Sequence, residues 1–255
     1  MLTAGIDIGS ITTKVAVLDG RNVLGTDLGF TGYNPDKSWR EVYTRTLERL
    51  GLQESAISRI VSTGYGRQKV GIATKKITEI VCHAEGARHF LPAVRAVIDI
   101  GGQDSKFIRI GAHGDVAEFV MNDKCSAGTG RFLEVMARAL EVGLDEFGEI
   151  SAAARKPARI SNTCTVFAES EVISLIAQGE TRENIVAGLH QSIASRIVTM
   201  MGAGQTDRPI VMTGGVARNA GMRRALEAAL GTPLEVADTA QLNGAIGAAV
   251  LAQSL

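Results

Sequence analysis

Residues 7–14 read DIGSITTK, and residues 99–106 read DIGGQDSK. Both stretches fit one pattern, in which Asp-Ile-Gly is followed, after three further residues, by a small hydroxylated residue and a lysine. Each stretch follows a short apolar run and precedes another, which predicts a strand, a glycine-containing turn and a second strand. The repeated spacing indicates a duplicated β-hairpin with a carboxylate at the bend.

The segments around the two hairpins follow the same order twice. This order predicts an α/β protein with two similar lobes, residues 1–93 and 94–255, and a cleft between them. The small-residue helix predicted at 241–253 is expected to pack back on the first lobe. Strands are predicted near residues 3–8, 13–18 and 22–28, and again near 95–100, 105–110 and 116–121, with helices after each set.

The bends of both hairpins suit an anion. Gly, Ser and Thr in a tight bend expose backbone N–H groups and hydroxyls, and Lys14 adds a positive charge suited to phosphate. Two such bends facing each other would hold a polyphosphate from both sides, while Asp7 and Asp99 would hold a hydrated Mg²⁺. A third turn, Thr213-Gly214-Gly215, follows an apolar strand and lets a nucleotide approach the backbone closely.

The composition argues against several classes of protein. Among 255 residues, 27 Lys or Arg balance 27 Asp or Glu, so there is no basic excess for binding nucleic acid. No apolar run approaches the ~20 residues of a membrane span, and the first residues lack the pattern of a signal peptide. We therefore expect a cytoplasmic protein with neither nucleic acid nor membrane as partner. Three cysteines in a chain of this length do not make a disulfide framework.

Six segments together resemble a known family, the ATPase activators (component A) of 2-hydroxyacyl-CoA dehydratases, which is shared with the ATPase subunits of benzoyl-CoA reductase. They are GIDIGS, STGYGR, VIDIGGQDSK, MNDKCSAGTGRFLEVM, TCTVFAESEVIS and MTGGVARN. The resemblance covers nearly the whole chain. It implies two ribonuclease H-like lobes of the type found in actin, Hsp70 and sugar kinases, since the glycine turns are shared with that wider superfamily.

The same resemblance implies an ATP-driven one-electron donor. Its cofactors would be ATP, Mg²⁺ and one [4Fe-4S] cluster shared by the two subunits of a homodimer. A ferredoxin or flavodoxin would supply the electron, and an iron–sulfur dehydratase or reductase would receive it.

We expect the phosphates to be held by the two bends, and the resemblance adds residues for the adenosine. Glu134 is implied near the ribose, although a solvated helix glutamate is the alternative reading. Asp99, Gln103 and Asp104 are all placed to orient the attacking water, and the sequence does not choose among them. The phosphate set is Ser10, Ile11, Thr12, Thr13, Lys14, Gly101, Gly102, Gln103 and Asp104, and the implied adenosine set is Gly214, Gly215 and Gln241.

Cys125 and Cys164 share a setting, because each lies in a polar loop that leads into a predicted helix. A [4Fe-4S] cluster usually takes four thiolates, and two cysteines per chain make four across a two-fold axis. A helix N-terminus beside each thiol would stabilise negative charge. A lone cysteine in a cytosolic protein is most often a buried, unreactive thiol, and that is the alternative for each of the two. That reading is the one we adopt for Cys82, placed at an expected strand–helix junction.

Two other functions use the same fold. A sugar or acetate-type kinase would need a substrate-binding insert, for which 255 residues are few, and would leave the cysteines without a role. A regulatory ATP-binding protein without a cluster would contain no iron.

Overall fold

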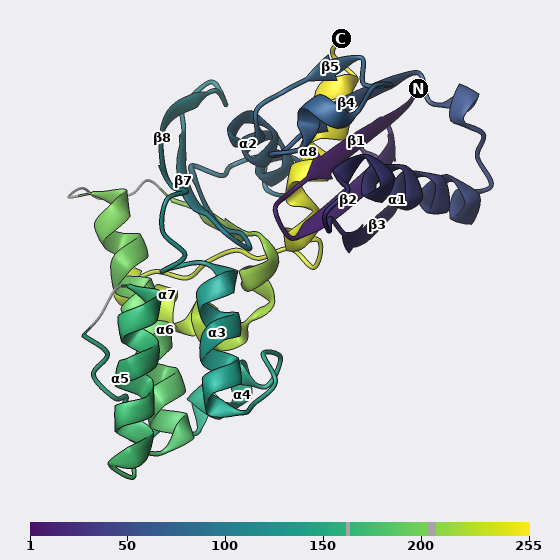
Figure 1. The fold of residues 1–255 in the computed structure, drawn as a ribbon. Helices are drawn as coiled ribbons and strands as arrows, with labels where there is room; N and C mark the ends of the chain where they lie inside the picture. Colours follow the sequence, from purple (N-terminus) through teal and green to yellow (C-terminus); the bar gives the residue numbers. More distant parts are fainter. Residues whose placement is uncertain (162–163, 203–207) are drawn as a thin grey trace. The chain divides into compact units, whose positions relative to one another are not determined.

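The computed structural model describes residues 1–161, 164–202 and 208–255, and these form two compact units (Figure 1). The first unit comprises Met1–Val97, Ile108–Glu118 and Ala237–Leu255. The second comprises Ile98–Phe107 and Phe119–Val236.

The first sheet contains the first hairpin. Its strand order is β3-β2-β1-β4-β5, with β1 and β2 antiparallel, β2 and β3 antiparallel, and β4 parallel to β1. The three strands expected at the N-terminus are confirmed. The bounds are β1 (Leu2–Ile8), β2 (Thr12–Asp19), β3 (Asn22–Phe30), β4 (Arg59–Thr63) and β5 (Lys75–Lys76).

Helices cover both faces of this sheet, because alternate residues of β2 are apolar on both sides. Val15 and Val17 pack in one core cluster with Trp39 of α1 (Pro35–Leu50). Ala16 and Leu18 pack in another with residues of α8 (Asn243–Ala252). The third helix, α2 (Glu79–Phe90), packs along α8.

Capping groups set the ends of α1. The Asn34 side chain accepts a hydrogen bond from Lys37 N at 3.1 Å, and Pro35 occupies the first helical position. Gly51 ends the helix in the left-handed conformation, with φ of 65°.

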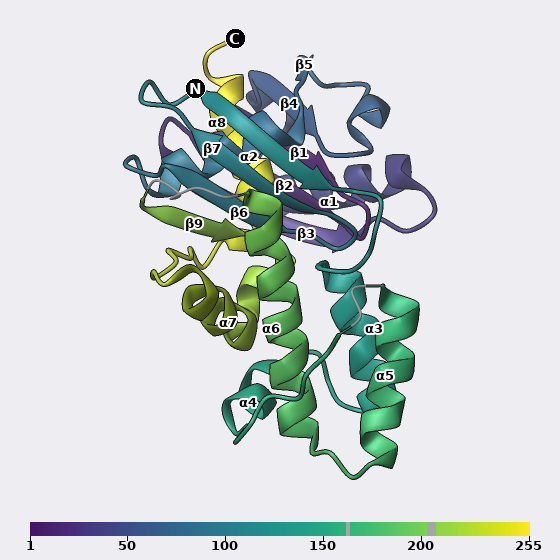
Figure 2. The same ribbon diagram turned by 90° about the vertical axis from the view of Figure 1, so that its left-hand side faces the viewer.

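The second sheet contains the second hairpin and is drawn in Figure 2. Its order is β8-β7-β6-β9, and every residue of β6 is buried. The strands expected near 95–100, 105–110 and 116–121 are confirmed. The bounds are β6 (Ala96–Ile100), β7 (Ser105–Ile110), β8 (Val116–Asn122) and β9 (Ile210–Thr213).

Helices make up most of the second unit. Helix α6 contacts α4, α5 and α7, while α3 contacts α5. Buried Phe132, Leu133 and Met136 form the apolar face of α3. The bounds are α3 (Gly130–Leu140), α4 (Phe147–Ala152), α5 (Thr165–Ala177), α6 (Arg182–Met201) and α7 (Ala220–Leu230); four 3₁₀ turns, η1 (Glu54–Ala56), η2 (Arg67–Lys69), η3 (Gly215–Arg218) and η4 (Ala240–Leu242), complete the described elements.

The expected position of Cys82 at a strand–helix junction is wrong. Helix α2 begins at Glu79, so Cys82 lies inside the helix and is fully buried. In the described residues, no helix is long and apolar enough to cross a membrane.

Candidate functional site

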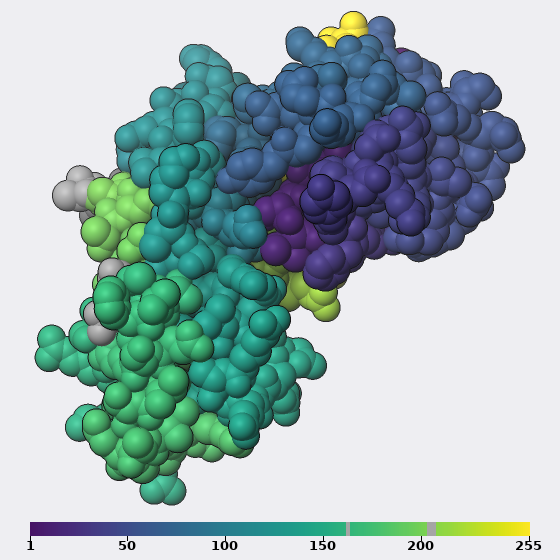
Figure 3. Space-filling model, in the orientation of Figure 1, coloured from purple at the N-terminus to yellow at the C-terminus, as the bar shows by residue number. Residues whose placement is uncertain are grey.

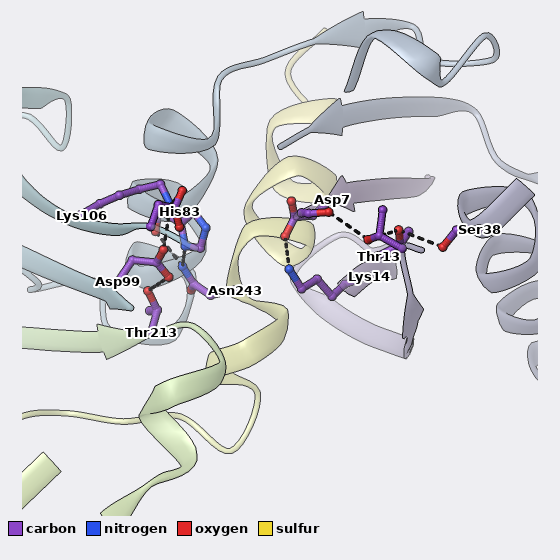
Figure 4. Close-up of polar contacts among 12 residues, drawn as sticks. Asp7, Thr13, Lys14, Ser38, His83, Asp99, Lys106, Thr213 and Asn243 are labelled. Carbon is purple, nitrogen blue, oxygen red and sulfur yellow. Dashed lines mark hydrogen bonds and ion pairs between the residues drawn. The ribbon is translucent and has the colours of Figure 1, made fainter. Parts of the chain in front are cut away.

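The first hairpin pairs a carboxylate with a lysine. In the antiparallel register of β1 and β2, Asp7 lies opposite Lys14, so the two side chains leave the same face of the sheet. Lys14 Nζ is 3.0 Å from Asp7 Oδ2 (Figure 4). The Asp7 side chain is 6% exposed and that of Lys14 is 14% exposed, so the lysine is the more accessible partner.

The turn of this hairpin leaves two backbone donors available. Gly9 N donates to Thr12 O at 3.1 Å, which closes the bend. The N–H groups of Ser10 and Ile11, half-buried at its tip, donate to no acceptor in the described part of the chain. Adjacent N–H groups of this kind form a concave site for an anion.

Thr13 has a different role from its neighbours in the bend. Its hydroxyl lies 3.0 Å from the Thr31 hydroxyl and accepts a hydrogen bond from Ser38 Oγ at 3.1 Å (Figure 4). All three residues are buried. The Thr13 hydroxyl therefore belongs to the contact between β2 and α1, and any nucleotide contact from Thr13 would use its backbone.

Two glycines let other segments approach Asp7. Gly64 follows β4 with φ of 83°, and a Cβ there would overlap the Ile8 carbonyl oxygen and lie 2.6 Å from Asp7 Oδ1. A Cβ on Gly244, in the first turn of α8, would lie 3.1 Å from both Asp7 Oδ2 and His83 Nε2. Asn243 donates to the backbone oxygen of His83 at 2.9 Å, which ties α8 to α2 (Figure 4).

The second hairpin repeats the ion pair and adds a second carboxylate. Lys106 Nζ is 3.1 Å from Asp99 Oδ2, which corresponds to the pair of Lys14 and Asp7, and 2.8 Å from Asp104 Oδ2. All three side chains are at most 6% exposed. Thr213 Oγ1 also donates to Asp99 Oδ1 at 2.9 Å (Figure 4).

The second bend has the same backbone hydrogen bond as the first. Gly101 N donates to Asp104 O at 2.9 Å, as Gly9 N does to Thr12 O. The N–H groups of Gly102 and Gln103 have no acceptor among the described residues. Of the three residues considered for orienting water, Gln103 is exposed, while Asp99 and Asp104 both contact Lys106. Their roles stay predictions.

The turn after β9 matches the turn after β4. Gly214 has φ of 88°, and a Cβ there would overlap the Ile100 carbonyl oxygen and lie 2.9 Å from Asp99 Oδ1. Gly64 has the same relation to Ile8 and Asp7. The duplication thus includes a second pair of segments, STG at 62–64 and MTG at 212–214. Gly215, the other predicted nucleotide residue, begins the short turn η3.

Helix α3 begins directly on the second bend. Gly130 N donates to Gly101 O at 2.9 Å, and Arg131 N donates to Gly102 O at 2.8 Å. These are helix-start donors that have no partner within the helix. Glu134, one turn further along α3, is partly exposed and pairs with Arg131 at 2.9 Å.

Hydrogen bonds among nearby residues fix the conformation of the loop that carries Cys125. Asn122 Nδ2 donates to Cys125 O at 2.9 Å and to Ala127 O at 3.1 Å. Thr129 Oγ1 donates to Ser126 O at 2.5 Å, and Gly128 adopts φ of 87°. The loop is therefore fixed by its own hydrogen bonds, and Cys125 stays partly exposed.

The two predicted cluster cysteines lie in adjacent loops. Cys164 is exposed and occupies the N-cap of α5. The residues that follow the two cysteines are hydrogen-bonded, because Ser126 Oγ lies 2.7 Å from Thr165 Oγ1. Among the described residues, no group of three or more His, Cys, Asp or Glu side chains could hold a metal ion.

Cys82 is chemically separate from this pair. Burial raises the pKa of the Cys82 thiol to about 12, and the charge of Asp7 adds to the effect. A thiol with this pKa stays protonated at neutral pH, so it is a poor nucleophile and a poor metal ligand.

The predicted site residues fall in both units. The first unit contains the first hairpin and Gln241, which is half-buried in η4. The second unit contains the second hairpin, Glu134, Gly214, Gly215 and both cluster cysteines.

Sequence reasoning missed several groups around the carboxylates. Thr213 on Asp99 and the match of Gly64 with Gly214 had a signal in the repeated Thr-Gly after an apolar run. His83 and Asn243 had none, because the two lie 160 residues apart.

Comparisons with known proteins add an independent finding. The profile of the BadF/BadG/BcrA/BcrD ATPase family matches residues 4–252. The chain is 47% identical over 253 residues to the activator of lactoyl-CoA dehydratase from Anaerotignum propionicum, an alignment that covers 99% of this chain and 97% of that relative.

Solved structures also match the whole chain. Component A of the (R)-2-hydroxyglutaryl-CoA dehydratase from Acidaminococcus fermentans superposes with a TM-score of 0.96 at 43% identity, over 100% of this chain and 98% of that one. The activator of the 2-hydroxyisocaproyl-CoA dehydratase from Clostridium difficile, with bound ADPNP, gives 0.94 at 42% identity, over 100% and 95%. A ROK family glucokinase from Streptomyces griseus gives 0.63 at 14% identity, covering 100% of each chain. The predicted fold class, that of actin, Hsp70 and sugar kinases, is thereby confirmed.

Proposed function

The chain belongs to the BadF/BadG/BcrA/BcrD ATPase family, and on that premise we propose that it hydrolyses MgATP to drive one-electron transfer to an iron–sulfur enzyme. The recipient is a 2-hydroxyacyl-CoA dehydratase or a related reductase of the benzoyl-CoA reductase type. The relatives described as dehydratase activators support this choice.

The observation that carries the proposal is the match between the two bends. Each bend has two N–H groups without an acceptor in the described chain, beside a carboxylate paired with a lysine. Such donors suit phosphate oxygens. The proposal assigns the phosphates to Ser10–Lys14 and Gly101–Asp104, and the adenosine to Glu134, Gly214, Gly215 and Gln241. The structure of a relative with bound ADPNP supports a nucleotide of this size.

The donor set at the bends also suits Mg²⁺. This ion prefers oxygen ligands and keeps several of its waters. Asp7 and Asp99 supply buried carboxylate oxygens, and each already has a lysine beside it, so contact through water fits better than direct coordination. Catalysis then depends on positioning the water and neutralising phosphate charge.

Cys125 and Cys164 fit half of a [4Fe-4S] site. Their loops are joined by Ser126 and Thr165, both thiols reach solvent, and Cys164 lies at a helix N-terminus. A second copy of the chain would supply the other two thiolates. When bound, such a cluster supplies one-electron redox chemistry.

The surface beside Cys164 supports the homodimer. Val166 and Phe167 follow the cysteine on α5 and are 67% and 63% exposed, and Ile173 is also exposed. Helix α5 lies at the surface in the space-filling view (Figure 3). Apolar side chains gathered on an exposed helix favour burial against another subunit.

Helix α3 supports coupling between nucleotide and cysteines. It begins on the carbonyl oxygens of Gly101 and Gly102, and the Cys125 loop leads directly into it. A displacement of the second bend would therefore be transmitted through the start of α3 to the loop that carries Cys125. A ferredoxin or flavodoxin is proposed as electron source, and the unpaired thiols favour the reducing cytoplasm as the setting.

Iron content tests the cluster. Protein purified without oxygen should contain about four irons for every two chains, with visible absorbance that bleaches on reduction. Cys125→Ala and Cys164→Ala should lose the iron, while Cys82→Ala should keep it as the matched control. A fully assembled cluster in Cys125→Ala would show that the ligand assignment is wrong.

ATP hydrolysis tests the nucleotide site separately. Asp7→Ala should abolish turnover, whereas Asp19→Ala, an exposed aspartate at the end of β2, should retain it. Normal turnover in Asp7→Ala would rule out the proposed metal role while leaving the cluster proposal intact.

A further inference from the structure

A cavity of about 500 Å³ with a mixed polar and apolar lining lies in the second unit, and it includes Ser105, the residue that follows the second bend. Its lining comes from β7, β8, residues 160–161 and α6. Five hydroxyl side chains, the amide of Asn122 and the guanidinium of Arg196 line it beside three apolar residues. No carboxylate is among these described lining residues, so the lining carries a single positive charge.

Ser105 is the most deeply buried polar group of the lining. It is 1% exposed, and its Oγ has no hydrogen-bond partner in the described structure. Ser105 holds the same place in the second hairpin as Thr13 in the first. Thr13 is satisfied by Thr31 and Ser38. In the second copy Ser105 lines the cavity instead, and a buried hydroxyl left unpaired is costly.

Arg196 is the one charged side chain among the described residues of the lining. It is partly buried and makes no hydrogen bond or ion pair with any described residue. Ser192 and Thr199 lie four residues before and three after it on α6, so they share its face of the helix. A guanidinium with hydroxyl donors around it, and no acid to neutralise it, suits an oxyanion.

We propose that this cavity binds a small anion through a phosphate or carboxylate group, with Arg196 pairing the charge and Ser105, Ser192 and Ser195 donating to its oxygens. A volume of about 500 Å³ is within the usual range for small-molecule sites. It exceeds what a bare phosphate needs, so the group would belong to a small organic molecule whose apolar part contacts Ile197 and Met200.

Two residues that line the cavity also form hydrogen bonds close to the two cysteines in the sequence. Asn122 lines it and donates to Cys125 O. Ser161 lines it too, and its backbone N and Oγ donate to the Glu171 carboxylate on α5, at 3.0 and 2.8 Å. Anion binding should therefore slow the alkylation of Cys125 in cluster-free protein.

The test uses the full chain and radiolabelled inorganic phosphate in equilibrium dialysis, with MgADPNP present to occupy the phosphate subsites of the nucleotide. Wild-type protein should bind one phosphate per chain. Arg196→Gln should weaken that binding about tenfold or more, because it removes a charged hydrogen-bond donor. Arg182→Gln removes an exposed arginine from the same helix outside the cavity and should bind as wild type does.

Two further binding measurements show where the phosphate binds and which anions the site accepts. Lys14→Gln should leave this phosphate bound, whereas loss in Lys14→Gln alone would place it at the first hairpin and overturn the proposal. Competition by acetate would show that the site accepts carboxylates, and its absence would restrict the ligand to a phosphate group. Failure of MgADPNP to bind would count against the nucleotide proposal and not against the cavity.

Ser105→Ala keeps the proposal testable if Arg196→Gln folds poorly. It should bind phosphate several-fold more weakly, without a lower melting temperature in the absence of phosphate, since it removes an unpaired hydroxyl. Equal affinity for phosphate in wild type and Ser105→Ala, or no saturable binding in wild type, would overturn the proposal.

Discussion

Lys14 and Lys106 occupy the same place in two copies of one hairpin, yet their surroundings differ. Lys14 contacts Asp7 and is 14% exposed, while Lys106 contacts both Asp99 and Asp104 and is 3% exposed. The backbone hydrogen bonds of the two bends are the same. Duplication has kept the backbone geometry while the side chains have diverged, which leaves one lysine available to a ligand and one as the centre of a buried charge cluster.

Replacing each lysine by methionine should separate these roles. Lys106→Met leaves two buried carboxylates without their cation and should lower the free energy of unfolding by ~3–5 kcal/mol. Lys14→Met leaves one buried carboxylate instead of two, and Lys14 is itself 14% exposed, so its contact with Asp7 is partly screened by water and the change should cost only ~1–2 kcal/mol. Urea unfolding of nucleotide-free protein at neutral pH measures both. Equal losses would contradict the difference in burial.

Glycine-to-alanine changes in the two matched turns should give similar losses. Gly64→Ala and Gly214→Ala each place a Cβ on a backbone carbonyl oxygen at a positive φ. We expect each overlap to cost ~2–3 kcal/mol or more. At Gly214 the backbone adds to this cost, because its φ of 88° and ψ of 174° form a conformation essentially restricted to glycine. Thermal melting compares the two variants, with Gly179→Ala as a control for positive φ in open space. A loss in only one of the pair would show that the turns are not equivalent.

Acid should destabilise the second unit through His190. Burial, and secondarily Arg224, lowers the pKa of His190 to about 4. Between pH 6.5 and 4 the unfolded chain binds a proton that the folded chain does not. The free energy of unfolding should therefore fall as pH falls through this window, by up to ~3 kcal/mol.

Unfolding measured between pH 7 and 4.5 checks this expectation. His190→Gln should show a weaker dependence on pH than wild type, while His113→Gln, at an exposed histidine, should keep the wild-type dependence. A wild-type slope retained in His190→Gln would assign the acid sensitivity to other groups.

The smallest expected difference concerns the hydroxyl before each lysine. Thr13→Val removes a partner from Thr31 and Ser38 and should cost ~1 kcal/mol. Ser105→Ala removes a hydroxyl without a described partner and should cost nothing or stabilise slightly. The midpoints of urea unfolding for the two variants give the comparison, which would be refuted if Ser105→Ala were the more damaging.

Much of the fold could be predicted because it depends on local patterns. The apolar runs around DIGSITTK and DIGGQDSK predicted the strands, and the segments around the cysteines predicted the family, which the match over residues 4–252 confirms. The junction expected at Cys82 is wrong, because α2 already begins at Glu79. The lobe boundary near residue 94, and the metal and nucleotide ligands, stay predictions.

What could not be predicted depends on contacts between distant segments. The contact between Ser126 and Thr165 has no signature in the sequence, because it joins segments 39 residues apart and requires the folded chain. Ser105 could be aligned with Thr13 from the repeat alone. Its missing partners could be found only from the packing around it.

The docking of α3 on the second bend has a consequence for hydrogen exchange. The first amides of a helix usually exchange quickly, since they lack acceptors within the helix. Gly130 and Arg131 instead donate to Gly101 and Gly102. Their deuterium uptake should be slow in the resting protein, and it should speed up whenever the bend separates from the helix while the rest of α3 stays protected. The exchange rates of these two amides would therefore measure how often the bend and the helix separate.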